Sequence, residues 1–291
     1  MRFLGLVVAA SLLLPPGCAL AASPALTVVA AENFYGGLAQ VVAGAHASVV
    51  SILSNPDQDP HLFEADPKTA RALAGASVVI ANGADYDPWI DKLLGASARK
   101  DRVVITVADL AGKKSGDNPH LWYDPATMTR LADRLATDLA GADPTHAADY
   151  RANAARFTAS LDPLNRTIAS MRQRYAGKPV TASEPVFGYM ADLIGLDMRN
   201  RPFQTAVMNG TEPSPADVAA FEDDLRSHKV AAMLYNSQAD DAAVKRLVGI
   251  ARDAHVPVVG VTETEPADKS YEAWMMSQLD ALDTALASGR S

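Results

Sequence analysis

Short apolar runs rich in β-branched residues recur along the chain, each followed by an amphipathic stretch, and this alternation constrains the fold most. Strands are predicted at 26–31, 48–53, 76–81 and 103–107, with helices at 34–42, 67–74 and 88–94. The rhythm returns after residue 178, with strands at 180–182, 230–235 and 256–261 and helices at 186–193, 215–225, 242–254 and 271–287. Nearly continuous apolar strands between helices indicate parallel sheets covered on both faces.

A single long helix is predicted between the two halves, at 144–175. Its apolar residues are spaced alternately by three and four and form one stripe: Tyr150, Ala154, Phe157, Leu161, Leu164, Ile168, Met171 and Tyr175. Pro163 lies inside this stripe and predicts a kink or break one turn earlier. A coiled-coil dimer is the alternative, but the proline favours packing onto the chain's own lobes. We therefore expect an α/β fold, with two α/β lobes of mainly parallel sheets joined by a single long rigid helix.

The first residues are typical of a secretory signal peptide. Arg2 precedes an uncharged apolar run at 3–14, which is too short to span a bilayer, and Ala19-Leu20-Ala21 suits cleavage. We predict a signal peptide at 1–21, an N-terminal lobe at 22–142, the linking helix at 143–177 and a C-terminal lobe at 178–291. A lipid-anchored form beginning at Cys18 is the alternative, although Pro15 occupies the place where a lipoprotein signal has an aliphatic residue.

The charge and cysteine content narrow the possible functions. The net charge is −8 and no long basic run is present, so we expect no nucleic-acid partner. Cys18 is the only cysteine, and the mature chain therefore has neither disulfides nor thiolate metal ligands. Any metal ligands must therefore come from His, Asp or Glu. We also expect the protein to be a monomer.

Two histidines share one local context. Asp59-Pro60-His61-Leu62-Phe63 and Asn118-Pro119-His120-Leu121-Trp122 both read acid or amide, Pro, His, Leu, aromatic. Each loop follows a predicted strand, and open α/β sheets bind ligands beyond the carboxyl ends of their strands. Neutral imidazole is a common ligand of divalent first-row metals, so His61 and His120 are candidate metal ligands. Two unrelated histidines with similar contexts are the alternative.

The chain resembles the metal-specific, cluster A-I (cluster 9) solute-binding proteins of zinc and manganese ABC importers. The resemblance covers the whole mature chain and is carried by the two histidine motifs with Glu64, and by Phe187-Gly188-Tyr189, Glu212-Pro213-Ser214 and Val261-Thr262-Glu263-Thr264. It implies one metal ion between two lobes, held by two side chains from each lobe. His61 and His120 match the N-lobe ligands.

The resemblance also implies two C-lobe ligands, Glu184 and Glu263. Both follow predicted strands, although Glu184 also suits the first turn of a helix and Glu265 competes with Glu263. Zinc-type relatives usually carry His at the position of Glu184 and manganese-type relatives Glu. Two carboxylates favour Mn²⁺ or Fe²⁺, whereas the general affinity order favours Zn²⁺; the element therefore stays open.

Two polar positions after strands have several interpretations. Glu32 and Asn33 follow the first strand and either cap a helix or line the cleft. Asn236 follows the 230–235 strand, where a turn is favoured over hydrogen bonds to a ligand carboxylate.

The expected function is that of a periplasmic binding protein which captures Zn²⁺ or Mn²⁺, with Fe²⁺ as a third candidate, and delivers the ion to an ABC permease at the inner membrane. The alternative is a secreted zinc-dependent hydrolase with a two-His, one-carboxylate site. No His-Glu-x-x-His or Gly-x-Ser-x-Gly motif is present, and four protein ligands would close the site to a catalytic water. We therefore expect no enzyme activity.

Overall fold

A computed structural model describes residues 26–55, 63–238 and 242–288. The proposed signal peptide, Cys18 and His61 lie outside these ranges. Within them, no helix is both long and apolar enough to cross a membrane.

The N-terminal lobe is built on a four-stranded parallel sheet in the order β2-β1-β3-β4. Its strands are β1 (Leu26–Glu32), β2 (Ala47–Leu53), β3 (Val78–Ala81) and β4 (Val103–Thr106). Its helices are α1 (Asn33–Ala43), α2 (Pro67–Gly75), α3 (Pro88–Ala96) and α4 (Val107–Ala111). Because all four strands are parallel, their carboxyl ends meet at one edge of the sheet, as the apolar strand pattern predicted.

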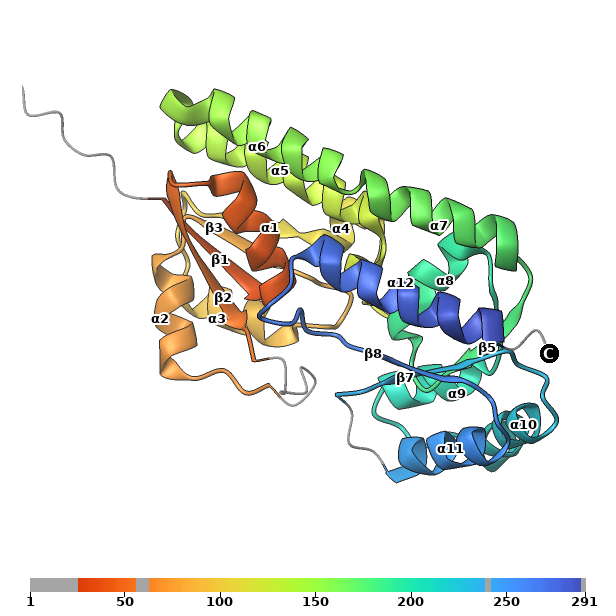
Figure 1. Cartoon of the computed structure of the whole chain (residues 1–291). Helices are drawn as coiled ribbons and strands as arrows, with labels where there is room; N and C mark the ends of the chain where they lie inside the picture. The colour runs from red at the N-terminus through yellow and green to blue at the C-terminus, as the bar shows by residue number, and fades with distance from the viewer. Residues whose placement is uncertain (1–25, 56–62, 239–241, 289–291) are drawn as a thin grey trace, which may run out of the picture.

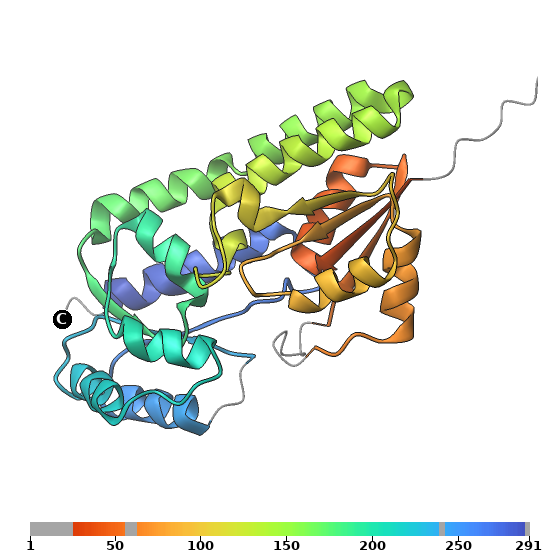
Figure 2. The same cartoon turned by 180° about the vertical axis from the view of Figure 1, so that it is seen from behind.

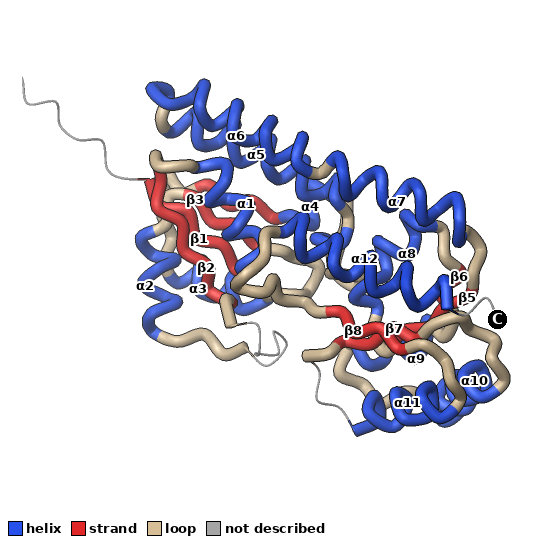
Figure 3. Tube along the Cα trace, in the orientation of Figure 1, coloured by secondary structure: helices blue, strands red, loops and turns tan. Residues whose placement is uncertain are grey.

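The C-terminal lobe repeats this plan with a second parallel sheet, in the order β6-β5-β7-β8 (Figure 3). Its strands are β5 (Pro179–Ala182), β6 (Asp197–Met198), β7 (Met233–Asn236) and β8 (Val258–Val261). Its helices are α8 (Gly188–Ile194), α9 (Arg201–Met208), α10 (Pro215–Arg226), α11 (Ala242–Asp253) and α12 (Tyr271–Ser288). The prediction of two α/β lobes is confirmed.

The long connector consists of α6 (Ala147–Ser160) and α7 (Asp162–Tyr175), which run along one side of both lobes (Figures 1 and 2). The predicted break falls at Leu161, two residues before Pro163, so the proline occupies the first turn of α7, where its missing N–H costs nothing. Helix α5 (Pro125–Ala142) lies against α6, and the sequence argument had not predicted it. Helix α6 also packs on α1, and α7 packs on α8 and α12.

One hydrophobic core extends through both lobes. Its buried members include Val28 and Ile80 of the first sheet, Leu234 of the second, and Trp122 and Trp274 between them. The connector's stripe, from Tyr150 to Tyr175, is buried in the same core. The two lobes are therefore joined by packed side chains as well as by the chain itself.

Candidate metal centre

His120 lies in the loop between α4 and the short helical turn Leu121–Tyr123, and its side chain is fully buried. The imidazole Nδ1 lies 2.6 Å from the Asn118 side-chain oxygen, which can only accept a hydrogen bond. Nδ1 therefore donates its proton, and Nε2 carries the lone pair of the neutral ring. Nε2 lies 3.4 Å from Glu263 Oε2 and has no hydrogen-bond partner in the described part of the chain.

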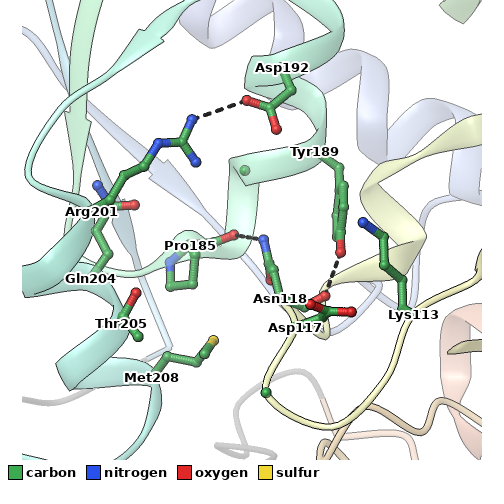
Figure 4. Close-up of a pocket in the computed structure, with 12 residues that line it drawn as sticks. Lys113, Asp117, Asn118, Pro185, Tyr189, Asp192, Arg201, Gln204, Thr205 and Met208 are labelled. Atoms are coloured by element: carbon green, nitrogen blue, oxygen red, sulfur yellow. Dashed lines mark hydrogen bonds and ion pairs between the residues drawn. The ribbon is translucent and has the colours of Figure 1, made fainter.

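Asn118 joins this histidine to the C-terminal lobe. Its oxygen also accepts from the His120 backbone N–H at 3.1 Å, while its side-chain nitrogen donates to the Pro185 carbonyl at 2.8 Å. The Tyr189 hydroxyl donates to the Asn118 carbonyl at 2.7 Å. Figure 4 shows these two inter-lobe contacts in the wall of a cavity of about 280 Å³. One amide thus fixes the ring orientation of His120 and holds the lobes together beside Glu184.

Glu184 and Glu263 follow β5 and β8, and both are buried. Between these strands lies β7, which ends at Asn236. The Asn236 side-chain nitrogen donates to Glu263 Oε1 at 2.6 Å and contacts Glu184 Oε2 at 3.3 Å. The chain turns at Ser237 and Gln238, as predicted, while Asn236 ends the strand and makes the carboxyl hydrogen bonds that the sequence had offered as the less favoured interpretation.

The N-terminal lobe contributes Tyr86 to the same carboxyl group. Its hydroxyl donates to Glu263 Oε2 at 2.9 Å, and burial together with the charge of Glu263 raises the pKa of the phenol. Tyr86 was not singled out from the sequence. Since it lies 177 positions from Glu263, no local pattern could have paired them.

Glu265, the alternative to Glu263 as the fourth metal ligand, has different contacts. Its backbone N–H and carbonyl pair with the Asn33 side chain, at 3.2 and 2.6 Å. Burial raises the pKa of its carboxyl group to about 8. Of the two acids, Glu263 is the one that the described contacts join to His120.

Asn82 and Asp87 form a hydrogen-bond network beside the His120 loop in the N-terminal lobe. The Asp87 carboxyl accepts from the backbone N–H groups of Asn82 and Gly83 at 2.7 and 2.8 Å, and burial raises its pKa to about 6. The Asn82 side chain donates to the Pro119 carbonyl at 2.9 Å and accepts from the Tyr35 hydroxyl at 2.6 Å. Through the hydrogen bond from Asn82 to Pro119, this network positions the loop that carries His120.

Buried acids outnumber buried lysines and arginines among the described residues of this region. Five carboxyl groups are buried around the cleft: Glu32, Asp87, Glu184, Glu263 and Glu265. Among the described residues no lysine or arginine is buried, and the other two buried acids, Glu222 and Asp224, pair with exposed arginines elsewhere. Among the described residues, the cleft therefore contains more buried acids than buried bases, and His120 is its buried basic group.

The structure brings together three of the four residues singled out from the sequence, namely His120, Glu184 and Glu263. His61 belongs to a segment outside the described residues. Within the described segments, no three His, Cys, Asp or Glu side chains meet closely enough to hold a metal ion. The Asn236 side chain contacts both glutamates, and the fourth candidate, His61, lies outside the described residues.

A pair of parallel-sheet lobes with a connector along one side and an acid- and histidine-lined centre between them defines a two-lobed binding protein. The model of the family described as zinc-uptake complex component A, periplasmic (ZnuA), matches residues 28–285. The chain belongs to this family of metal-binding, substrate-binding proteins of ABC transporters, which are not enzymes.

Several relatives are similar over nearly the whole chain. The manganese ABC transporter substrate-binding lipoprotein PsaA of Streptococcus mitis is 24% identical over 283 residues, covering 90% of this chain and 89% of PsaA. The iron ABC transporter substrate-binding lipoprotein MtsA of Streptococcus pyogenes serotype M1 is 24% identical, covering 93% and 92%. The binding protein FpvC of P. aeruginosa, solved with Ni²⁺, has a TM-score of 0.75 at 20% identity, covering 92% and 99%.

Proposed function

We propose that this protein captures a divalent first-row transition-metal ion between its lobes and delivers it to the permease of an ABC importer. His61, His120, Glu184 and Glu263 would be the ligands. Capture would take place outside the inner membrane, in the periplasm, after export by the N-terminal signal. The ion is cargo, so four protein ligands that exclude a reactive water suit the task.

The observation that carries the proposal is the burial of Glu184 and Glu263 at the centre where His120 Nε2 approaches Glu263 to 3.4 Å. Buried carboxylates are ordinarily paired with bases or coordinate metals, because isolated ionised groups are very costly to bury. Here Glu184 and Glu263 lie together without a buried lysine or arginine among the described residues. A divalent cation would supply the charge that these carboxyl groups lack.

The spacing of His120 and Glu263 supports the same proposal. Two ligand atoms, each about 2.1 Å from a tetrahedral metal ion, lie about 3.4 Å apart. His120 Nε2 and Glu263 Oε2 are separated by 3.4 Å. Asn118 leaves the Nε2 lone pair available, as a metal-bound histidine with a fixed outer hydrogen bond requires.

The donor set favours the harder ions of this group. Two carboxylates and two imidazoles are richer in oxygen than a three-histidine zinc site, which favours Mn²⁺ or Fe²⁺. Zn²⁺ retains its intrinsic advantage at almost any such site, and the named relatives include manganese, iron and nickel binders. We propose Mn²⁺ or Zn²⁺ as cargo, with Fe²⁺ as the third candidate.

The proposal is tested by titrating chelator-treated protein with Mn²⁺, Zn²⁺ and Fe²⁺ in a calorimeter, with Fe²⁺ kept under anaerobic conditions. One ion should bind per chain, and His120→Ala should weaken binding by at least about 100-fold, because loss of a ligand should exceed the 10- to 100-fold cost of losing an outer hydrogen bond.

The matched control is His228→Asn. His228 is exposed in the C-terminal lobe, and its backbone has a positive φ of 51°, which asparagine tolerates. Its affinity should equal that of the unmodified protein. Unchanged affinity in His120→Ala would overturn the proposed site, and failure of all three ions to bind would overturn the proposed function.

A further inference from the structure

Glu32 is a buried acid for which metal ligation provides no role. It ends β1 at the edge where the candidate ligands gather, and only 2% of the residue is exposed. It occupies the N-cap position of α1, one of the two places that the sequence offered for it, but its side chain makes no capping hydrogen bond. Neither carboxyl oxygen has a hydrogen-bond partner among the described residues.

A charged carboxylate in these surroundings would be very costly. Burying an ionised group without a partner disfavours the charged form so strongly that the group takes up a proton instead. Accordingly, burial first and then the charge of Asp87 raise the pKa of Glu32 well above its ordinary value. No nearby base offsets this effect in the described chain.

The groups around Glu32 are acids and phenols from several elements. Asp87 is the N-cap residue of α3, Tyr86 precedes it, and Tyr35 lies on α1. The pKa of Tyr86 is raised first by burial and then by the charges of Glu263 and Glu32, so this phenol lies within electrostatic reach of both acids. Glu32 therefore senses the charge at the candidate metal centre through a low-polarity interior, where electrostatic interactions are strong.

We propose that Glu32 holds a proton in the metal-free protein and releases it to solvent when the cleft takes up a divalent cation. The inference rests on the proposed metal capture. Two positive charges beside Glu263 would favour the ionised form of Glu32, and by linkage protonation of Glu32 would favour release of the ion. Glu32 would act through charge and not as a ligand.

The test is calorimetric titration of Mn²⁺ into the full protein in buffers of different ionisation enthalpy, which counts the protons released per bound ion. At pH 7 the unmodified protein should release about one more proton than Glu32→Gln. Between pH 6 and 8 its dissociation constant should fall by about tenfold more per pH unit than that of the variant. Glutamine has the shape of the protonated acid, so the metal-free fold is retained.

Glu222→Gln is the matched control, because Glu222 is also buried but pairs with Arg226 and Arg246 outside the cleft. Its proton count should equal that of the unmodified protein. Equal counts for Glu32→Gln and the unmodified protein would overturn the inference while leaving metal capture intact, whereas failure of Mn²⁺, Zn²⁺ and Fe²⁺ all to bind would overturn the proposed function first.

A second measurement keeps the inference testable if Glu32→Gln does not fold. Infrared difference spectra of the unmodified protein should show loss of a protonated-carboxyl carbonyl band when the metal is added. A spectrum without such a loss would overturn the inference.

Discussion

Asn118 performs three tasks with one side chain and one carbonyl. It fixes the His120 ring, donates to Pro185 and accepts from Tyr189. An outer-shell partner of this kind orients a ligand and raises its basicity. We therefore treat Asn118 as a positioning residue.

Replacing Asn118 by alanine should weaken metal binding about 10- to 100-fold, because the His120 ring loses its fixed tautomer and orientation. Isothermal titration calorimetry measures this change directly. Asn209→Ala, at an exposed position after α9, serves as the control and should bind as the unmodified protein does. Affinity in Asn118→Ala within twofold of normal would contradict the positioning role.

Asp87 should make the stability of the metal-free protein depend on pH. Burial raises its pKa from 3.8 to about 6, so the folded state holds the proton more tightly than the unfolded chain. Its stabilising contribution is complete below about pH 4 and is lost as the pH rises through about 6, by roughly 2–3 kcal/mol.

Urea unfolding of the protein and of Asp87→Asn at several pH values between 4 and 7 measures this effect. The free energy of unfolding should fall more with rising pH in the unmodified protein than in the variant. Asp87→Asn would also weaken a hydrogen bond to the Asn82 or Gly83 backbone. This would lower the variant's free energy of unfolding by an amount that does not depend on pH. If the difference in the free energy of unfolding between the protein and Asp87→Asn did not change with pH, the raised pKa of Asp87 would be ruled out.

The sequence identified the residues whose chemistry is visible locally, and missed those defined by distant contacts. His120 stood out through its neighbours, and Glu184 and Glu263 through family resemblance and strand ends. Tyr86 lies 177 positions from Glu263 in the sequence. Asn236 lies 27 positions from Glu263 and 52 positions from Glu184. Such pairings depend on how the lobes meet, and no local spacing records that.

At the scale of elements, the predicted strands and the stripe of the connector reappear because their apolar periodicity is strong. Helix α5 was missed although it carries a signal: Asp124 caps it, Pro125 begins it, and Met128, Leu131, Leu135 and Leu139 line its buried face. The two-residue strand β6 could not be predicted, since two residues show no periodicity. It exists because β5 offers it a backbone partner.

The break at Leu161 shows how a local rule and a tertiary contact combine. Pro163 forbids a continuous helical hydrogen-bond ladder through Ser160. Both helices nevertheless bury one stripe in the common core, so the interruption does not separate them. The connector therefore remains a packed brace and does not become a loose joint.

For the whole molecule, a core shared between the lobes predicts small domain motion. Opening the cleft widely would expose buried side chains such as Trp122 and Trp274 and break the contacts of α7 with α12. We expect the radius of gyration, measured by small-angle X-ray scattering, to differ by less than about 1 Å between metal-free and metal-bound protein.

The comparison needs chelator-treated protein and the same sample reloaded with Mn²⁺, at matched concentration. A decrease of several ångströms in the radius of gyration on metal loading would indicate a hinge that opens widely, and would contradict the prediction of small domain motion.

The buried acids of the cleft have a consequence for the proposed delivery. If a divalent cation is the cargo, its departure removes two positive charges from beside these carboxyl groups, which is costly unless another positive charge takes its place. Under the proposed function, the receiving membrane protein would have to bind the ion more strongly with ligands of its own, or protons would have to enter the cleft as the metal leaves. Unloading would then be an exchange of positive charge, and the pH of the surroundings would set one side of its balance.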